Sequence, residues 1–165
     1  MKRAIVISNV LSWINLVIGS VFALLAFLTV GAFPPIAVLL SVVLIGCIVL
    51  HSYAAIQLRK SIIRPEMPLN RQTPVGIRMM GYMALFFAIM MFSNAIFMLQ
   101  NTKDLLKGVA LPAQLNENDF ITIIHITGSI ILLFALSVII NVVLNFRLLR
   151  WWYIMSENNN DTNKQ

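Results

Sequence analysis

Residues 59–78 read RKSIIRPEMPLNRQTPVGIR, and this basic, proline-rich stretch divides an otherwise apolar chain in two. It holds five of the twelve Lys and Arg residues and three of the six prolines. Long apolar segments lie on either side of it. The prolines keep those segments from joining into one helix, and the charges favour one side of a membrane over the other.

Four apolar segments extend outward from this stretch, two before it and two after it. The predicted spans are residues 4–30, 36–57, 75–99 and 120–149. Each is long enough, because a helix of about 20 residues crosses a bilayer core about 30 Å thick. None alternates polar and apolar residues as the strands of a membrane barrel do. The sequence therefore predicts an all-α membrane protein: a four-helix transmembrane bundle over residues 1–155 and a disordered polar tail over 156–165.

The composition supports the same class. The chain is 59% hydrophobic and 11% charged, whereas a soluble domain has about 25% charged residues. A soluble fold with so little charge could not cover its own core. Cys47 is the single cysteine, so the chain has no intramolecular disulfide framework.

The distribution of charge predicts the orientation. With four spans, both termini and the stretch 59–78 share one side, and ten of the twelve Lys and Arg residues lie there. Only Lys103 and Lys107 lie on the other side. Positive residues that flank spans are retained in the cytoplasm. We therefore expect two antiparallel hairpins with both termini cytoplasmic, in a multi-pass protein of a bacterial inner (plasma) membrane.

The N-terminus also has features of a secretory signal, because Lys2 and Arg3 precede an apolar run. That run is longer than the core of a signal peptide, which has about 7–15 residues. We therefore expect a retained first helix.

At the other side of the membrane, residues 102–108 are expected to form a short amphipathic helix that ends near Gly108.

Small and weakly polar residues recur at helical spacing on one face of three predicted spans. In lipid, such residues let helices approach closely and bond across their interface. The predicted packing residues are Ser12, Asn15, Gly19, Ala23, Gly81, Ala84, Ala88, Asn141 and Asn145. A functional alternative places Asn15, Asn94, Asn141 and Asn145 around a polar cavity.

The predicted spans contain few side chains that could catalyse a reaction or bind an ion. No Asp or Glu lies within a predicted span, which argues against an ion-coupled transporter or a proton relay. His51 and His125 are expected at different depths, too far apart to ligate one haem iron. Cys47 and the methionines of residues 79–98 are ligand types that suit copper(I), but methionine is also a common packing residue. We predict no catalytic residue, no metal site and no cofactor.

Two functions fit these observations. The first is a non-catalytic membrane subunit, scaffold or regulator that acts through helix packing. The alternative is a small transporter or channel for a neutral or lipid-like solute. An enzyme is a third possibility that lacks a nucleophile or base set, so we predict that the protein is not one.

The predicted partners are the lipid bilayer and either a second copy or another membrane subunit. The basic residues Arg59, Lys60, Arg64 and Arg71 are expected to reach anionic lipid headgroups or an acidic partner from a connection that its prolines keep extended. No nucleic acid is expected, because the basic stretch lacks aromatic side chains that stack on bases.

Overall fold

The computed structural model describes residues 2–28, 34–64, 69–70, 72–106 and 116–162. Within these ranges the chain is all-helical and has no strand. Its helices are α1 (Lys2–Leu28), α2 (Pro35–Ile63), α3 (Gln72–Gln100), α4 (Thr102–Leu106) and α5 (Glu117–Thr162). All of these except α4 are long and apolar enough to cross a membrane. The chain is therefore a multi-pass membrane protein, as its sequence predicts.

Proline explains where α2 ends and where α3 begins. A residue that precedes proline is disfavoured in the helical conformation. Arg64 precedes one, and its φ of −125° and ψ of 88° end α2 at Ile63. At the start of α3, the backbone N–H of Gln72 donates to Asn70 Oδ1 at 3.0 Å. Pro74 lies in the first turn of α3 and not in an extended connection as predicted, because a first-turn N–H has no acceptor in its own helix.

Two helices are longer than the predicted spans. α2 continues past residue 57 to Ile63, so Arg59 and Lys60 are helical. α5 continues to Thr162, so the backbone of residues 156–162 is helical where a disordered tail was predicted. The reason is local, because no glycine or proline follows Gly128 to interrupt the backbone hydrogen bonds. Residues 163–165 lie outside the described ranges.

The short helix α4 follows α3 directly. It covers part of the predicted amphipathic helix, whose end near Gly108 lies outside the described residues. Asn116 precedes α5 and caps it, since its Oδ1 accepts a hydrogen bond from the backbone N–H of Asp119 at 2.8 Å. Glu117 and Asp119 occupy the first turn of α5, where a negative charge is favoured by the helix dipole.

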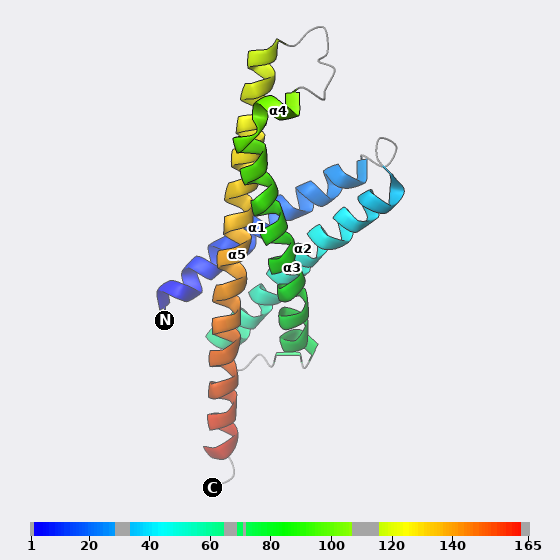
Figure 1. The fold of residues 1–165 in the computed structure, drawn as a ribbon. Coiled ribbons are helices and arrows are strands. Elements are labelled where there is room, and N and C mark those ends of the chain that lie inside the picture. The colour runs from blue at the N-terminus through cyan, green and yellow to red at the C-terminus, as the bar shows by residue number, and fades with distance from the viewer. Residues whose placement is uncertain (1, 29–33, 65–68, 71, 107–115, 163–165) are drawn as a thin grey trace.

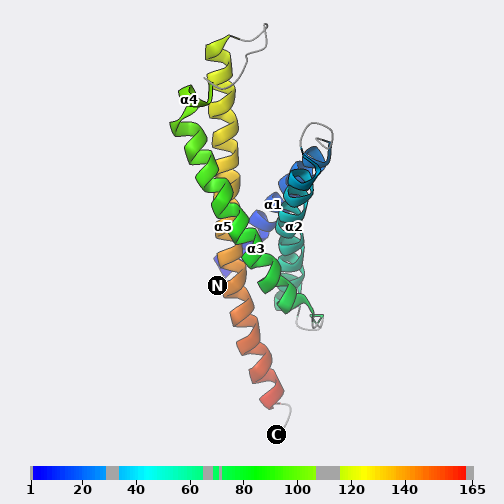
Figure 2. The ribbon, with the colours of Figure 1, turned by 45° about the vertical axis from the view of Figure 1, so that its right-hand side comes forward.

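The four long helices pack as two pairs. α1 lies along α2, and α3 lies along α5 (Figures 1 and 2). The pairs cross where α2 contacts α3 and α1 contacts α5. The largest cluster of buried apolar side chains is at this crossing, and its buried members are Ile48, Ala84, Ala88, Phe134, Val138 and Val142.

Glycine permits close contact in each pair. A Cβ atom on Gly19 of α1 would lie 3.1 Å from Cγ2 of Val49 on α2. A Cβ atom on Gly128 of α5 would lie 3.0 Å from Cδ2 of Leu99 on α3. Both distances are shorter than ordinary van der Waals contact, so a larger residue at either position would push the helices apart or displace its neighbour.

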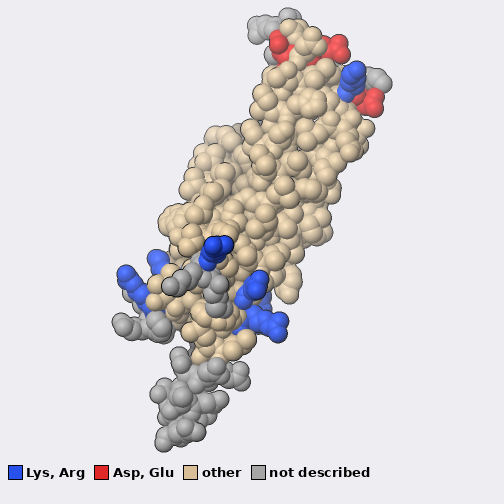
Figure 3. Space-filling view, turned by 90° about the vertical axis from the view of Figure 1, so that its left-hand side faces the viewer, with Lys and Arg blue, Asp and Glu red and all other residues tan. Residues whose placement is uncertain are grey.

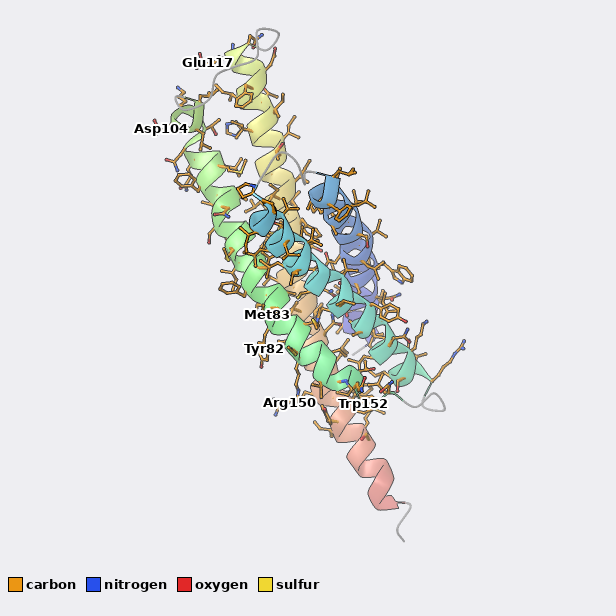
Figure 4. All side chains as sticks on the ribbon, turned by 90° about the vertical axis from the view of Figure 1, so that its right-hand side faces the viewer. Tyr82, Met83, Asp104, Glu117, Arg150 and Trp152 are labelled. Atoms are coloured by element: carbon orange, nitrogen blue, oxygen red, sulfur yellow. The ribbon has the colours of Figure 1, made fainter. Side chains whose placement is uncertain are left out.

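The charged side chains collect at opposite ends of the bundle (Figure 3). At one end, Arg3 of α1 and Arg147 and Arg150 of α5 line the same cavity, and Arg78 of α3 lines an adjoining one with Arg150. We call this the basic end. Asp104 and Glu117 lie at the other end, far from Arg150 (Figure 4).

Candidate functional site

The interior of the bundle contains a chain of polar side chains, which we call the polar ladder. Its members are Ser8, Ser12 and Asn15 of α1, His51 of α2, and Ser137, Asn141 and Asn145 of α5. All of them except Ser137 are at most 1% exposed. A polar side chain without a partner is costly in such a place. The partners of these side chains therefore decide what the ladder can do.

Two serine hydroxyls of α1 bond to asparagine side chains of α5. Ser8 Oγ donates to Asn145 Oδ1 at 2.6 Å. Ser12 Oγ donates to Asn141 Oδ1 at 2.9 Å. Within α5, Asn145 Nδ2 also donates to Asn141 Oδ1 at 3.1 Å. The two contacts are one helical turn apart on both helices, so they fix the register of α1 against α5.

A third contact extends the ladder by another turn. Ser137 Oγ donates to Asn15 Oδ1 at 2.8 Å, and Asn15 Nδ2 donates to the backbone oxygen of Ser137 at 3.4 Å. From Ser8 to Asn15 along α1, the bonded partners run backward along α5, from Asn145 to Ser137. The two helices therefore run in opposite directions with matched polar faces.

His51 connects α2 and α3 to the ladder. Its Nδ1 lies 3.1 Å from the backbone oxygen of Ile77. A carbonyl oxygen only accepts, so Nδ1 carries a hydrogen, and in the neutral imidazole Nε2 is then an acceptor. Asn145 Nδ2 lies 3.4 Å from Nε2 and donates to it. Gly81 leaves room for the imidazole, because a Cβ atom there would lie 3.0 Å from His51 Cε1.

The ladder is built from neutral groups that bond to one another. Ser8 and Ser12 donate to amide oxygens and not to His51, so neither hydroxyl is placed for activation by a base. Among the described residues, no group of three His, Cys, Asp or Glu side chains could hold a metal ion. The arrangement is suited to fixing the depth, rotation and direction of the helices.

Arg59 and Ser52 of α2 are buried outside the ladder. The Arg59 side chain is 2% exposed, and its Nε donates to the backbone oxygen of Ala55 at 3.1 Å. Its two terminal nitrogens have no hydrogen-bond partner, and neither does Ser52 Oγ. Arg59 therefore does not present its guanidinium to lipid headgroups, contrary to prediction, because α2 continues through this position and turns the side chain into the bundle.

The residues predicted for helix packing lie at helix contacts or next to them. Ser12, Asn15, Asn141 and Asn145 belong to the polar ladder. Gly19, Gly81, Ala84 and Ala88 are buried, and Ala23 is half-buried. The alternative of a polar cavity also required Asn94, which is exposed on α3 and does not meet the other three.

The predicted headgroup residues other than Arg59 lie elsewhere. Lys60 and Arg64 are exposed at the end of α2, and Arg71 lies outside the described residues. His125 is exposed on α5 and lines a cavity with α4. It is therefore separate from His51, as the predicted difference in depth requires.

Sequence reasoning missed the partners of His51, and it missed that Arg3, Arg147 and Arg150 line one cavity. A polar residue within a span has to be bonded, which marks His51 as internal but does not identify its partner. For the arginines, the distribution of charge along the sequence predicts only that all three lie on the same side of the membrane. It does not predict which helices are neighbours.

Comparisons with protein-family models, with curated proteins and with solved structures return no match to this chain.

Proposed function

We propose that this chain is a non-catalytic integral membrane protein, a subunit, scaffold or regulator, that acts through lateral contacts of its helices. The polar ladder is the observation that carries the proposal. A carrier or channel for a polar solute needs polar groups directed at the solute path. Here the polar groups of α1 and α5 face one another. The single side chain of Asn145 contacts three others, those of Ser8, Asn141 and His51.

The outer faces of the helices supply the surface for such contacts. Large apolar side chains are exposed along every span, among them Trp13 of α1, Tyr53 of α2, Phe86 and Phe97 of α3 and Leu133 of α5. Each faces lipid or a neighbouring protein. A second copy of the chain or another membrane subunit is the partner we propose for one of these faces.

A photo-crosslinking scan in native membranes tests this proposal. A photoreactive amino acid would replace exposed residues one at a time along α1 and α3, including Trp13, Phe86 and Phe97. We expect positions three or four residues apart on one face to yield an adduct with a protein of one mass, because one helix face contacts one partner. Lys103, exposed outside the span of α3, serves as the control and should yield no such adduct.

The opposite outcome favours the alternative function. If every position on α1 and α3 reacts with lipid alone, the chain has no lateral protein partner. Faster swelling of liposomes that contain the purified protein, in glycerol or urea, would then support transport of a neutral solute.

The proposal includes an orientation in a bacterial inner membrane, with two antiparallel hairpins and both termini in the cytoplasm. It is supported by the gathering of arginines at the basic end (Figure 3) and by the positive-inside rule. Reporter fusions after Gln57, Gln100 and Gln165 should report inside, outside and inside. An outward C-terminus would contradict this orientation and the assignment of the basic end to the cytoplasm.

We also propose a binding role for the basic residues in and next to the connection between α2 and α3. Lys60 and Arg64 are exposed next to it, and Arg71 belongs to it. We propose that these three residues contact anionic headgroups or an acidic partner, with each charge near the surface contributing about 1 kcal/mol.

A further inference from the structure

A cavity of about 510 Å³ lies between the first turn of α1 and the part of α5 that follows the polar ladder. Its lining includes Arg3 from α1 and Arg147, Arg150, Leu148, Trp151 and Ile154 from α5. The three arginines are exposed at this site, whereas Leu148 is buried. The cavity therefore combines positive charge with an apolar wall.

The helices place these residues together for a definite reason. Arg150 and Trp151 follow Arg147 by three and four residues, and Ile154 follows them by four and three, so the four residues share one face of α5. The contacts Ser8–Asn145 and Ser12–Asn141 fix the register of α1. Extending that register to the start of α1 brings Arg3 opposite Arg150. The polar ladder therefore also builds the cavity.

The charge in this cavity is not balanced by the acidic side chains that the structure describes. Asp104 and Glu117 lie at the opposite end of the bundle from Arg150 (Figure 4), and Asp119 shares the first turn of α5 with Glu117. Three guanidinium groups held near one another repel, and an anion between them offsets that repulsion. Guanidinium matches phosphate especially well, because its planar N–H groups donate to two phosphate oxygens at once.

We propose that this cavity binds the phosphate group of an anionic phospholipid from the leaflet at the basic end. Arg3 and Arg147 donate to the phosphate, and Arg150 supplies the third positive charge. Leu148 and Ile154 contact the upper part of the acyl chains. Trp151 lies at the boundary between headgroups and chains, where tryptophan is enriched. A free phosphate ion shares the charge but makes no use of the apolar wall.

Native mass spectrometry of the purified full chain tests the proposal. The protein would be titrated with phosphatidylglycerol and, separately, with zwitterionic phosphatidylcholine. We expect retention of phosphatidylglycerol and at least tenfold weaker retention by the variant Arg3→Gln/Arg147→Gln, since each basic residue at a headgroup contributes about 1 kcal/mol and about 1.4 kcal/mol is tenfold. Both residues are exposed, so circular dichroism should show unchanged helix content.

A matched variant separates a site from general surface charge. Arg78→Gln removes one exposed charge of the basic end that does not line this cavity, and we expect less than about twofold weaker retention, against about fivefold for Arg147→Gln alone. Equal weakening by these two single variants would overturn the proposal, as would equal retention of phosphatidylcholine. Competition with inorganic phosphate identifies the source of the ligand. Millimolar phosphate should not displace the lipid, and displacement would assign the cavity to a free anion.

Discussion

Replacing Gly81 with alanine is expected to lower the free energy of unfolding by about 1–3 kcal/mol, the range for overpacking in a tight core. The added Cβ atom would lie 2.6 Å from Cε1 and 2.7 Å from Cζ of Phe146, and 3.0 Å from Cε1 of His51. Neither ring can move freely. Phe146 packs against Tyr82, with ring centroids 5.1 Å apart, and His51 is bonded to Ile77 and to Asn145.

Gly76→Ala is the matched control for this change. Gly76 lies on the same helix, and a Cβ atom there meets nothing within 4 Å. Alanine favours a helix over glycine by about 0.8–1.0 kcal/mol, so this variant should be neutral or slightly more stable. Unfolding by sodium dodecyl sulfate in mixed micelles measures both variants. Equal stability of the two would mean that α3 does not approach His51 and Phe146 as closely as described.

The second large effect is expected for Asn145→Ala, at about 2–3 kcal/mol of lost stability. Asn145 accepts from Ser8, donates to Asn141 and donates to His51. Its loss leaves the Ser8 hydroxyl and His51 Nε2 buried without these partners, in a place where water does not replace them. The Asn145→Ala variant should therefore lose more stability than a variant that removes a single hydrogen bond.

Asn94→Ala provides the comparison for that variant. Asn94 is also an asparagine within a span, but it is exposed on α3. A surface substitution of this kind changes stability by no more than about 0.5 kcal/mol. Unfolding in the same mixed micelles compares the two. If Asn94→Ala lowers the free energy of unfolding as much as Asn145→Ala does, the destabilisation comes from the loss of any amide side chain in a span and not from the loss of the ladder contacts.

Hydropathy and charge were sufficient to predict the helical class and the number of spans. They were less accurate at the ends of helices. The predicted second span stops before Arg59 and Lys60 because these residues are charged, yet α2 continues to Ile63. A helix is continued by its backbone hydrogen bonds, and a long basic side chain can keep its aliphatic part against apolar surface. Proline marks the end of α2 better than charge does.

Spacing along the chain placed Asn141 and Asn145 on one face of a helix, but it did not identify what that face contacts. The partners Ser8 and His51 come from two other helices. Their choice depends on how the helix pairs cross, which no local pattern encodes. For the same reason, the sequence could place Arg3 on one side of the membrane without predicting that it lines the same cavity as Arg147 of α5.

A double-mutant cycle on Ser8 and Asn145 tests most directly the central claim that the polar ladder holds α1 to α5. The free energies of unfolding of Ser8→Ala, Asn145→Ala and the double variant would be compared with that of the unchanged protein. We expect an interaction energy of about 0.6–1.7 kcal/mol, which extends from the average to the largest value for hydrogen bonds between membrane helices. Strict additivity of the two changes would contradict the claim, because the 2.6 Å contact between these side chains would then contribute nothing to the bundle.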